Sequence, residues 1–337
     1  MLLGHDFAGE HDPKREHTGP VFVLPDDTLV GLETARRLGI SSEQDLFGGV
    51  VPHPFVASKA ITHPLVDPDA SAPAGWSHAF GERVRDVVLD GYTVFALANA
   101  REAGARLLQR GPARLKAVRA KAGRGQCTVR NDAELQAALA KIDRTSLPTH
   151  GLVLEQNLAD VTTFSVGQVR VAELVITYYG TQRLTQDNSG EEVYGGSSLV
   201  VVRGGFESLL RLVLSEEVRL AVEQARVYDN AAKECFPEFF ASRRNYDVAR
   251  GRNADGHWSS GVLEQSWRVG GASGAEIAAL EAFRADAALR AVRAQSVELY
   301  GAADEPPANA TVYFQGIDER GGSMTKYAIV DRYDDPR

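Results

Sequence analysis

The segment with the clearest capacity for chemistry is residues 244–276. It holds two short stretches of strand-like composition on either side of a polar sequence with an Asp-Gly pair, which is the pattern of a β-hairpin with a long loop. Because successive side chains of a strand point to opposite faces, alternate residues share a face. The polar side chains expected on these shared faces are Asn245 and Asp247 on the first strand, and Glu264, Ser266 and Arg268 on the second.

If the two faces coincide, carboxylates, neutral oxygen-bearing groups and a guanidinium meet at one place. Mg²⁺ suits such a cluster because it takes one or two carboxylates and leaves positions for phosphate oxygens and water. Arg268 would hold a phosphate or a carboxylate with its two-pronged guanidinium. The alternative is a solvated hairpin with ordinary surface charges. The segment therefore indicates a candidate site for Mg²⁺ and a phosphorylated ligand.

A second candidate site lies earlier in the chain. Lys116 is predicted on a strand and precedes a loop, residues 121–126, that contains two glycines and leads into a returning strand. Such a loop can fold over phosphates with its backbone N–H groups as donors, while the lysine supplies a positive charge. The loop is not of the Walker A type, because no Gly-Lys-Ser/Thr sequence follows and no helix begins there. The alternative is an exposed lysine beside an ordinary hairpin turn.

A third candidate is the apolar strand of residues 151–158, which ends in the polar sequence Glu155-Gln156-Asn157-Leu158. The backbone edge of such a strand end can recognise adenine through main-chain hydrogen bonds, and an acid that follows it can bind ribose hydroxyls. The alternative is an ordinary sheet strand with a polar end.

The elements that must position these residues follow from hydrophobic periodicity, capping residues and Gly or Pro punctuation. Helices are predicted over residues 26–38, 79–89, 99–111 (capped by Asn99), 131–142, 215–236 and 275–299. Strands are predicted over residues 21–25, 92–97, 113–118, 127–130, 151–158 and 198–205, with paired strands in 161–180. A glycine-rich loop is predicted over 185–198, and a closing hairpin around Gly321. This order lacks repeated βα alternation and predicts α+β domains with antiparallel sheets.

Composition places the chain among ordinary globular proteins. Its 337 residues suffice for roughly two domains, or one with an extension, and a hydrophobic content of 44% allows a sizeable core. The net charge of −8 argues against a nucleic-acid partner, which normally requires a basic surface. The two cysteines, Cys127 and Cys235, are far apart, so neither a disulfide framework nor a zinc motif is indicated.

The sequence also argues against a membrane partner. No apolar run reaches the ~18 residues of a transmembrane helix. The first twenty residues are polar and lack the apolar core of a signal peptide. We therefore expect a flexible N-terminal tail and a cytoplasmic enzyme.

Taken together, the candidate sites resemble the ATP-grasp superfamily in order and spacing. The resemblance covers about residues 59–274 and rests on a strand lysine (Lys116), a glycine loop (Gly123 to Gln126), a hinge (Glu155 to Leu158), Asp247, and the sequence LEQSWR that contains Glu264 and Arg268. The overall texture looks most like a bacterial ATP-grasp group, the DUF3182 proteins. The resemblance implies an α+β ATP-grasp fold, in which two α+β subdomains grip the nucleotide after a small N-terminal α/β domain.

The resemblance implies a role for each matching residue. Lys116 would contact the α- and β-phosphates and, with Arg268, act in catalysis. Residues expected to contact the nucleotide are Lys59 as an additional lysine, the flap residues Gly123, Arg124, Gly125 and Gln126, the hinge residues Glu155, Gln156, Asn157 and Leu158, and Asp160 as the nearest ribose acid. Residues expected to hold the metal are Asp247, Glu264 and Ser266. The implied cofactors are ATP and one or two Mg²⁺ ions, for which Mn²⁺ can substitute.

Two departures from the family pattern concern the metal and the ribose. Ser266 stands where the family commonly has asparagine, and Thr162 or Thr163 stands where a glutamate is common. These departures weaken the expectation of two-metal catalysis, but not that of nucleotide binding.

The resemblance implies an ATP-dependent ligase, in which a substrate carboxylate attacks the γ-phosphate and the acyl-phosphate is captured by an amine or another nucleophile. A small-molecule kinase and a nucleotide-binding protein without turnover stay open as alternatives. The implied partners are small-molecule carboxylate and amine substrates, and because family members are often dimers, a homodimer. Candidates for the substrate carboxylate are Arg183, Arg203 and residues 195–198, whereas His53, His63 and the three tryptophans are interpreted as structural.

The expected domain division follows the motifs. It comprises the flexible tail (residues 1–20), a small N-terminal α/β domain (21–90), a subdomain with the lysine and the glycine flap (91–160), and a metal-binding subdomain with the C-terminal helix and hairpin (161–337).

Overall fold

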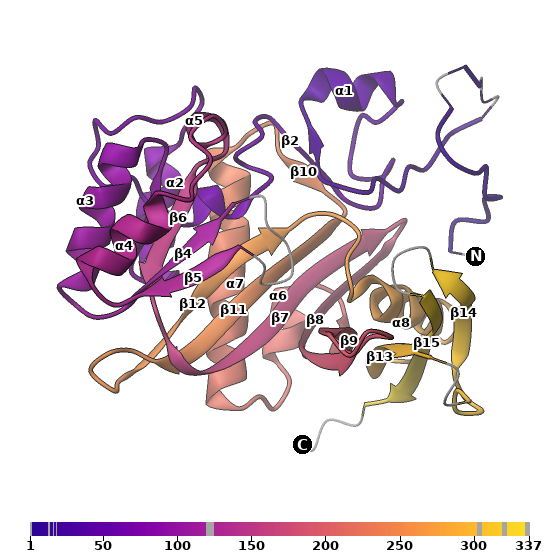
Figure 1. The fold of residues 1–337 in the computed structure, drawn as a ribbon. Helices are drawn as coiled ribbons and strands as arrows, with labels where there is room; N and C mark the ends of the chain where they lie inside the picture. Colours follow the sequence, from indigo (N-terminus) through magenta and orange to yellow (C-terminus); the bar gives the residue numbers. More distant parts are fainter. Residues whose placement is uncertain are drawn as a thin grey trace.

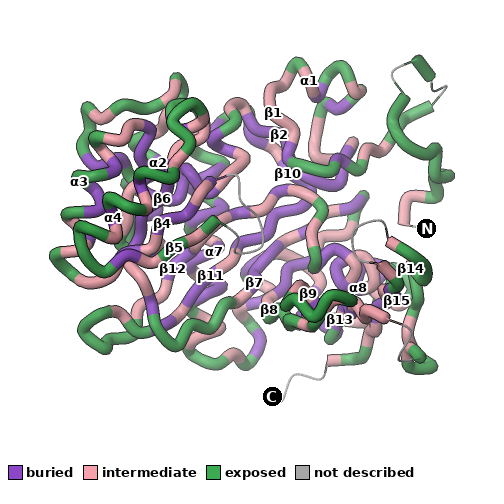
Figure 2. Tube along the Cα trace, viewed as in Figure 1, coloured by how far each residue is buried: buried purple, intermediate pink, exposed green. Residues whose placement is uncertain are grey.

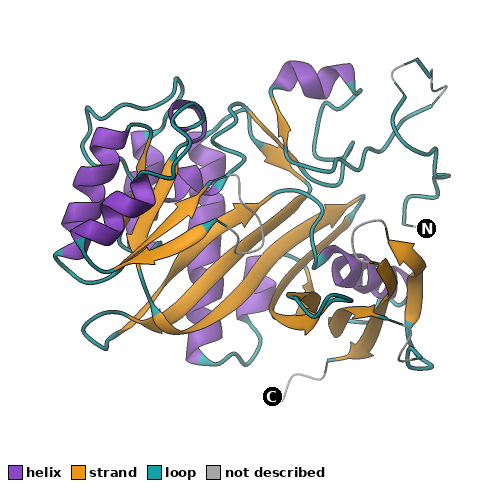
Figure 3. Cartoon of the chain, viewed as in Figure 1, coloured by secondary structure: helices purple, strands orange, loops and turns teal. Residues whose placement is uncertain are grey.

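The structure, a computed structural model, describes residues 2–12, 14–15, 17, 19–118, 125–301, 305–318 and 322–333. The strands within these ranges form sheets of three, eight and four strands, with helices packed on their faces (Figure 1 and Figure 3). All strand pairs of the two larger sheets are antiparallel. The predicted α+β class is therefore confirmed, and a lysine-bearing sheet beside a carboxylate-bearing sheet agrees with the ATP-grasp architecture that the resemblance implies.

The eight-stranded sheet is the largest layer. Its strands, in spatial order, are β12 (Trp258–Ser266), β11 (Arg243–Arg252), β7 (Ala159–Val171), β8 (Leu174–Gln186), β9 (Glu192–Arg203), β13 (Ala291–Tyr300), β15 (Gly322–Arg332) and β14 (Thr311–Asp318). Alternate side chains of β9 show how both faces are used, because Val200 and Val202 join the core beneath helix α7 (Glu216–Cys235), whereas Val201 joins the core beneath helix α8 (Ser273–Ala285). The sheet is thus buried on both sides along its middle (Figure 2).

The four-stranded sheet carries the predicted lysine. Its strands, in spatial order, are β3 (Gly91–Val94), β6 (Leu152–Gln156), β4 (Ala113–Ala117) and β5 (Gln126–Val129). Helices α3 (Leu97–Leu108) and α4 (Asp132–Leu139) cover its outer face (Figure 1). Asn131 caps α4 by accepting a hydrogen bond from the Glu134 N–H at 2.9 Å, as the capping box predicts. The other face of this sheet is free to line a cavity.

The three-stranded sheet joins distant parts of the chain. Strands β1 (Leu29–Val30) and β2 (Gly49–Val51) are parallel, and β10 (Phe240–Ala241) adds to β2 antiparallel. Helix α1 (Leu32–Arg37) lies beside them. Shorter helical segments complete the fold: η1 (Lys59–Thr62), α2 (His78–Val84), η2 (Arg85–Val87), α5 (Leu147–His150) and α6 (Phe206–Leu210). The expected domain boundaries stay a prediction.

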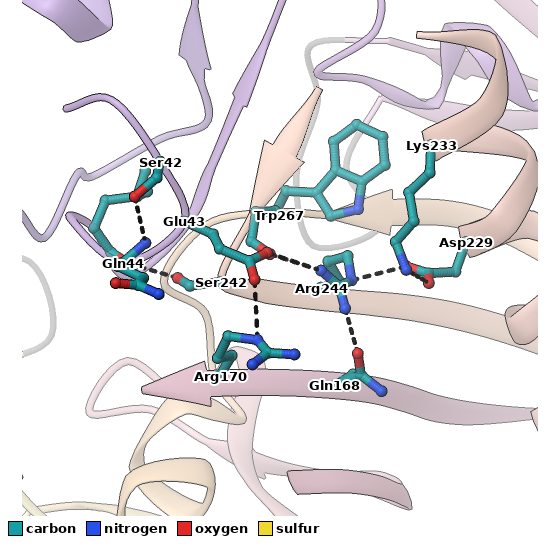
Figure 4. Close-up of polar contacts among 12 residues, drawn as sticks. Ser42, Glu43, Gln44, Gln168, Arg170, Asp229, Lys233, Ser242, Arg244 and Trp267 are labelled. Atoms are coloured by element: carbon teal, nitrogen blue, oxygen red, sulfur yellow. Dashed lines mark hydrogen bonds and ion pairs between the residues drawn. The ribbon is translucent and has the colours of Figure 1, made fainter. Parts of the chain in front are cut away.

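A charged network ties the N-terminal segment to the large sheet (Figure 4). Glu43 contacts Arg170 of β7 at 2.9 Å, and Arg244 of β11 forms an ion pair of 2.9 Å with Asp229 of α7. Lys233 reaches the other oxygen of Asp229 at 2.5 Å. Because Asp229 is almost inaccessible to solvent, these partners supply the compensation that a buried carboxylate requires.

The predicted strand at residues 21–25 and helix at 26–38 are wrong in detail. Val23 forms only an isolated bridge with Leu46, and the helix begins at Leu32. The reason is tertiary, since Leu29 and Val30 pair with β2 and cannot be helical. Asn99, expected to cap a helix, lies inside α3, which begins at Leu97.

Two further predictions are wrong because the residues concerned pair with other strands of the large sheet. The predicted loop at residues 185–198 is mostly strand, since β8 and β9 pair with each other down to Gln186 and Glu192. The predicted helix at 275–299 ends at Ala285, and β13 follows because it pairs with both β9 and β15. Within the described residues, no helix is long and apolar enough to cross a membrane.

Candidate active site

The two strands of the predicted hairpin bring the carboxylates together. Strands β11 and β12 pair antiparallel with Asp247 opposite Glu264 and Asn245 opposite Ser266. A shift of register follows directly after Asp247, so that Val248 faces Val262 and one residue of β12 is left over. The structure therefore places Asn245 and Asp247 of β11 on one face with Glu264 and Ser266 of β12, and the two acids lie side by side.

The surroundings of Asp247 disfavour its charged form. Its Oδ1 atom is buried and has no hydrogen-bond partner within the described residues. Burial first and the neighbouring Glu264 carboxylate second raise the pKa of Asp247 to about 7, against the opposing pull of Arg243, Lys59 and Lys116. A carboxylate in this state would be stabilised by an additional cation.

Lys116 lies on β4 and forms a buried ion pair. Its Nζ is 2.5 Å from Oε1 of Glu155 on β6, and Nε2 of His63 is 3.1 Å from the other oxygen. All three side chains are almost inaccessible to solvent. Burial would raise the pKa of Glu155, but the Lys116 ammonium and then His63 outweigh burial, so that this pKa lies below its ordinary value. The lysine side chain is therefore fixed in place by a buried ion pair.

Lys59 connects the two sides of the site. It opens η1, and its Nζ lies 2.6 Å from Oε2 of Glu264. The side chain of Lys59 is 7% exposed, whereas that of Glu264 is 35% exposed. One lysine thus faces the carboxylate pair while the other faces Glu155.

One cavity of about 270 Å³ joins these groups. Its charged and polar lining consists of Lys59, Arg114, Lys116, Gln126, Glu155, Gln156, Thr163 and Glu264. Its apolar lining consists of Leu89, Leu158, Val161, Ala249 and Leu263. Four of these, Leu89, Leu158, Ala249 and Leu263, pack together as a small cluster. The cavity therefore combines apolar walls with lysine, arginine and carboxylate side chains, a lining that could accept both a base and phosphates.

The expected hinge residues differ in what they offer. The backbone N–H groups of Gln156 and Asn157 donate to Asp90 O at 2.8 Å and to Pro112 O at 2.9 Å. These bonds hold the hinge to the ends of β3 and β4, so both donors are already used. Leu158, whose side chain lines the cavity, is the remaining hinge residue for main-chain recognition of a ligand.

Only part of the expected glycine flap lies within the described residues. Gly123 and Arg124 lie outside the described residues. Gly125 has a φ of 65°, a conformation that favours glycine, and its carbonyl accepts a 3.1 Å hydrogen bond from the Ala117 N–H. Gln126 opens β5 opposite Lys116 and lines the cavity.

Two expected site residues lie elsewhere. Arg268 was predicted on the same strand face as Glu264, but β12 ends at Ser266, and the Arg268 guanidinium lies 3.5 Å from Asp27 of the N-terminal segment. Asp160 is exposed, is not part of the cavity lining, and lies 4.0 Å from Arg252. A left-handed backbone conformation at Asp160, with a φ of 51°, turns the chain there.

Asn245 and Ser266, which share a strand face with Asp247 and Glu264, also form hydrogen bonds to other residues of the fold. Asn245 donates to Ser165 Oγ at 2.6 Å and to Tyr178 Oη at 3.1 Å, so its amide is held away from the metal position. The carbonyl oxygen of Ser266 accepts a hydrogen bond from Arg243 at 3.2 Å, which leaves the Ser266 hydroxyl as its possible metal ligand.

Sequence reasoning missed two contributors. Arg114 lies two residues before Lys116 and shares its strand face, so strand alternation could have identified it. It donates to Asn157 Oδ1 at 2.8 and 3.1 Å and to Gln126 Oε1 at 3.2 Å. His63 was interpreted as structural, and no local signal reveals its contact with Glu155, which lies 92 residues away.

Several secondary expectations are wrong. Arg203 does not face a substrate, since it donates to Leu289 O, Phe283 O and Asp286 O around the end of α8. Residues 196–198 belong to β9 and pair with β8 and β13, so their backbone groups serve the sheet, and the Gly195 carbonyl accepts a hydrogen bond from Arg183 at 3.2 Å. Trp258 is 48% exposed and stacks with Arg250 and Arg252, whereas Trp267 is a buried packing residue as expected.

The donor set fits Mg²⁺ better than a metal held by protein alone. Within the described ranges, no three His, Cys, Asp or Glu side chains lie close enough together to hold an ion by themselves. Asp247 and Glu264 supply two carboxylates, and the unpartnered Oδ1 of Asp247 is available to a cation. Mg²⁺ is commonly bound by one or two carboxylates together with substrate phosphates and water.

Comparisons with known proteins give a family. A comparison with curated protein sequences finds no match. Among solved structures, the chain is similar to D-alanyl-alanine synthetase A from Vibrio cholerae O1 biovar eltor str. N16961, with 12% identity, a TM-score of 0.41 and coverage of 72% of this chain and 66% of that one. It is also similar to phosphoribosylamine–glycine ligase from Thermotoga maritima, with 15% identity, a TM-score of 0.45 and coverage of 93% and 80%. Likenesses this distant do not identify an activity. The family described as "Protein of unknown function (DUF3182)" matches residues 1–328, and the chain therefore belongs to the DUF3182 family.

Proposed function

We propose that this protein is an ATP-grasp enzyme that uses ATP and Mg²⁺ to activate a substrate carboxylate as an acyl-phosphate, which an amine or a similar nucleophile then attacks. The observation that carries the proposal is the single cavity in which Lys59, Lys116 and Glu264 meet an apolar slot, with Asp247 paired beside Glu264. A second cavity, lined among others by Asp90, Arg110 and Asp255, contains neither lysine and lacks the carboxylate pair of the hairpin.

The lining of the cavity supports one orientation for the proposed nucleotide. Leu89, Leu158 and Leu263 offer an apolar slot for the base, and the hinge closes its end. The ammonium groups of Lys116 and Lys59 line the same cavity and would bind the phosphates. Nucleotide binding would then draw each lysine from its carboxylate partner toward phosphate oxygens.

Asp247 and Glu264, with Ser266, would hold Mg²⁺. When bound, the ion would neutralise charge on the phosphates and polarise the transferred phosphoryl group. The burial of Asp247 and its raised pKa support this assignment, because both make a bound cation favourable there.

The chemistry then requires positioning more than covalent help from the protein. A substrate carboxylate oxygen attacks the γ-phosphorus and ADP departs with the electron pair of the broken P–O bond. An amine nitrogen attacks the acyl carbon of the acyl-phosphate, phosphate departs, and the nitrogen loses a proton. The two lysines bind and orient the phosphates, and the apolar walls exclude water that would hydrolyse the acyl-phosphate.

ADP release tests the proposal. A panel of amino acids and peptides as acids and amines is screened with ATP and Mg²⁺, and products are identified by mass spectrometry. In the Glu264→Gln variant, nucleotide binding should persist while ADP release falls roughly 100- to 1000-fold, because a charge that acts in the transition state is lost. Glu216→Gln, at an exposed position at the start of α7, is the matched control and should keep full activity.

Two results would count against the proposal. Equal ADP release by wild type and Glu264→Gln would remove Glu264 from catalysis, and absence of Mg²⁺-dependent nucleotide binding would remove the nucleotide itself. A stable phosphorylated product without an amide would replace the ligase by a kinase at the same site.

A further inference from the structure

The segment that carries Lys59 wraps around the free edge of the large sheet. Residues 56–62 lie against β12, which is the first strand of the sheet order. Lys59 reaches Glu264 from this segment, although the two residues are 205 positions apart. A long and flexible lysine side chain reaches one carboxylate reliably only if its backbone is fixed relative to the strand.

Gln265 supplies this fixation. It follows Glu264 on β12, so its side chain points to the opposite face, where it is 6% exposed. Its Nε2 donates to Val56 O at 2.9 Å and to Ser58 O at 2.7 Å. Both protons of one side-chain amide are thus used on the backbone immediately before Lys59.

A second connection closes the network behind Gln265. Tyr228 of α7 donates its hydroxyl proton to Gln265 Oε1 at 3.1 Å. The same hydroxyl lies 3.2 Å from Thr62 Oγ1, which itself lies 3.4 Å from Leu263 O. The start and the end of η1 are therefore both tied to the strand that carries Glu264.

We propose that Gln265 is a positioning residue, which holds the backbone before Lys59 so that the ammonium lies within reach of Glu264 and of phosphates bound in the cavity. The inference deepens the proposed function and rests on it for the identity of the ligand. The glutamine amide supplies the two donors and the acceptor of this pattern, whereas ionised glutamate has no donor and methionine has no donor and only a weak acceptor.

The first measurement needs no nucleotide. Wild type and Gln265→Met are treated briefly with acetic anhydride, and acetylation of each lysine is followed by peptide mass spectrometry. Acetylation of Lys59 should be about 10-fold faster in the variant, because loss of buried hydrogen bonds frees the segment. Acetylation of Lys116, which is held by Glu155, should change less than about 2-fold.

Gln224→Met is the matched control. Gln224 is also a buried glutamine, donates to Ser260 O of the same strand at 3.0 Å and accepts from the Ser260 hydroxyl at 2.8 Å. Its loss should lower stability to a similar extent in urea unfolding but leave acetylation of Lys59 unchanged. An equal rise in both variants, or none in Gln265→Met, would overturn the proposal.

The second measurement is nucleotide affinity in a double-mutant cycle with Lys59→Met. Gln265→Met alone should weaken Mg²⁺-ATP binding about 10-fold, yet have little further effect when Lys59 is already absent. Independent effects of the two substitutions would contradict positioning through Lys59. If wild type binds no nucleotide, the proposed function fails, while the acetylation result still decides the role of Gln265.

Discussion

Strand β11 carries two charged groups on one face, and their surroundings are opposite. Arg243 is buried and forms a two-pronged ion pair with Glu276 of α8, with Nε–Oε2 and Nη2–Oε1 distances of 2.8 and 2.9 Å. Tyr178 donates to the same carboxylate at 2.5 Å. Asp247, four residues further along, keeps one buried oxygen without a hydrogen bond among the described residues.

Arg243 is fully paired and supports the fold, whereas Asp247 has a buried oxygen that is available to a ligand. Arg243 also donates to the carbonyls of Ser266 and Arg268, so it fixes the end of β12 and the turn toward α8. Buried polar groups are nearly always satisfied, and an exception calls for an explanation such as a missing ion. At Asp247 the explanation we favour is Mg²⁺.

The largest effect is expected from breaking the satisfied pair. Glu276→Ala leaves the Arg243 guanidinium buried without its carboxylate, which should cost about 3–5 kcal/mol of unfolding free energy. Urea denaturation measures the loss. Glu281→Ala, at an exposed position of the same helix, should change stability by less than about 0.5 kcal/mol. Similar losses in both variants would show that the pair is not special.

Lys116→Met should lower the unfolding free energy by about 2 kcal/mol, because Glu155 then keeps only His63 as a partner. The substitution should also abolish tight nucleotide binding, because the ammonium group proposed to bind the phosphates is lost. The lowered pKa of Glu155 contributes stability above the ordinary glutamate pKa, which is lost as pH falls. The gap between wild type and variant should therefore be wide at pH 7 and narrow toward pH 4. Unfolding curves across this range test it, with the exposed Lys141→Met as control; a gap that widens in acid would be contrary evidence.

Asp247→Asn should raise the unfolding free energy above neutral pH, whereas Lys116→Met lowers it. The raised pKa means that folding penalises the charged carboxylate, so wild-type stability falls as pH rises from about 4 toward the Asp247 pKa of about 7 and stays reduced above it. The variant should be roughly 1–2 kcal/mol more stable than wild type at pH 8 and similar at pH 4. Thermal unfolding at both pH values checks this, with Asp255→Asn in the hairpin loop as control. A variant that loses stability at pH 8 would mean that Asp247 supports the fold.

The smallest effect is expected at the far end of the same strand. Arg252 is partly exposed, lies over the Trp258 ring at 4.5 Å and lies 4.0 Å from Asp160. Arg252→Ala should change the unfolding free energy by at most about 1 kcal/mol and leave nucleotide affinity unaltered. A fall in affinity, measured by titration with Mg²⁺-ATP, would extend the site to Asp160 after all.

Local patterns predicted some elements well and others badly. Asn131 caps α4 as its spacing from Glu134 predicts, because both residues lie within one turn of the helix, although the Glu134 carboxylate accepts from the Asn131 side chain and the Arg130 N–H. Ser273 and Glu276 have the same spacing, but Glu276 turns to Arg243 instead of capping α8, and Ser273 is already helical. The pattern is identical, yet a buried arginine from β11 offers Glu276 a stronger partner than a backbone N–H.

The sequence by itself determined which residues share a strand face. Alternation placed Asp247 with Asn245 and Glu264 with Ser266, because side-chain direction in a strand depends only on the backbone of that strand. Only the tertiary structure decided which faces meet. Lys59 reaches Glu264, and His63 reaches Glu155, through sheet edges that chain folding brings together across many residues. Such contacts depend on packing between distant segments, and no pattern within one segment encodes them.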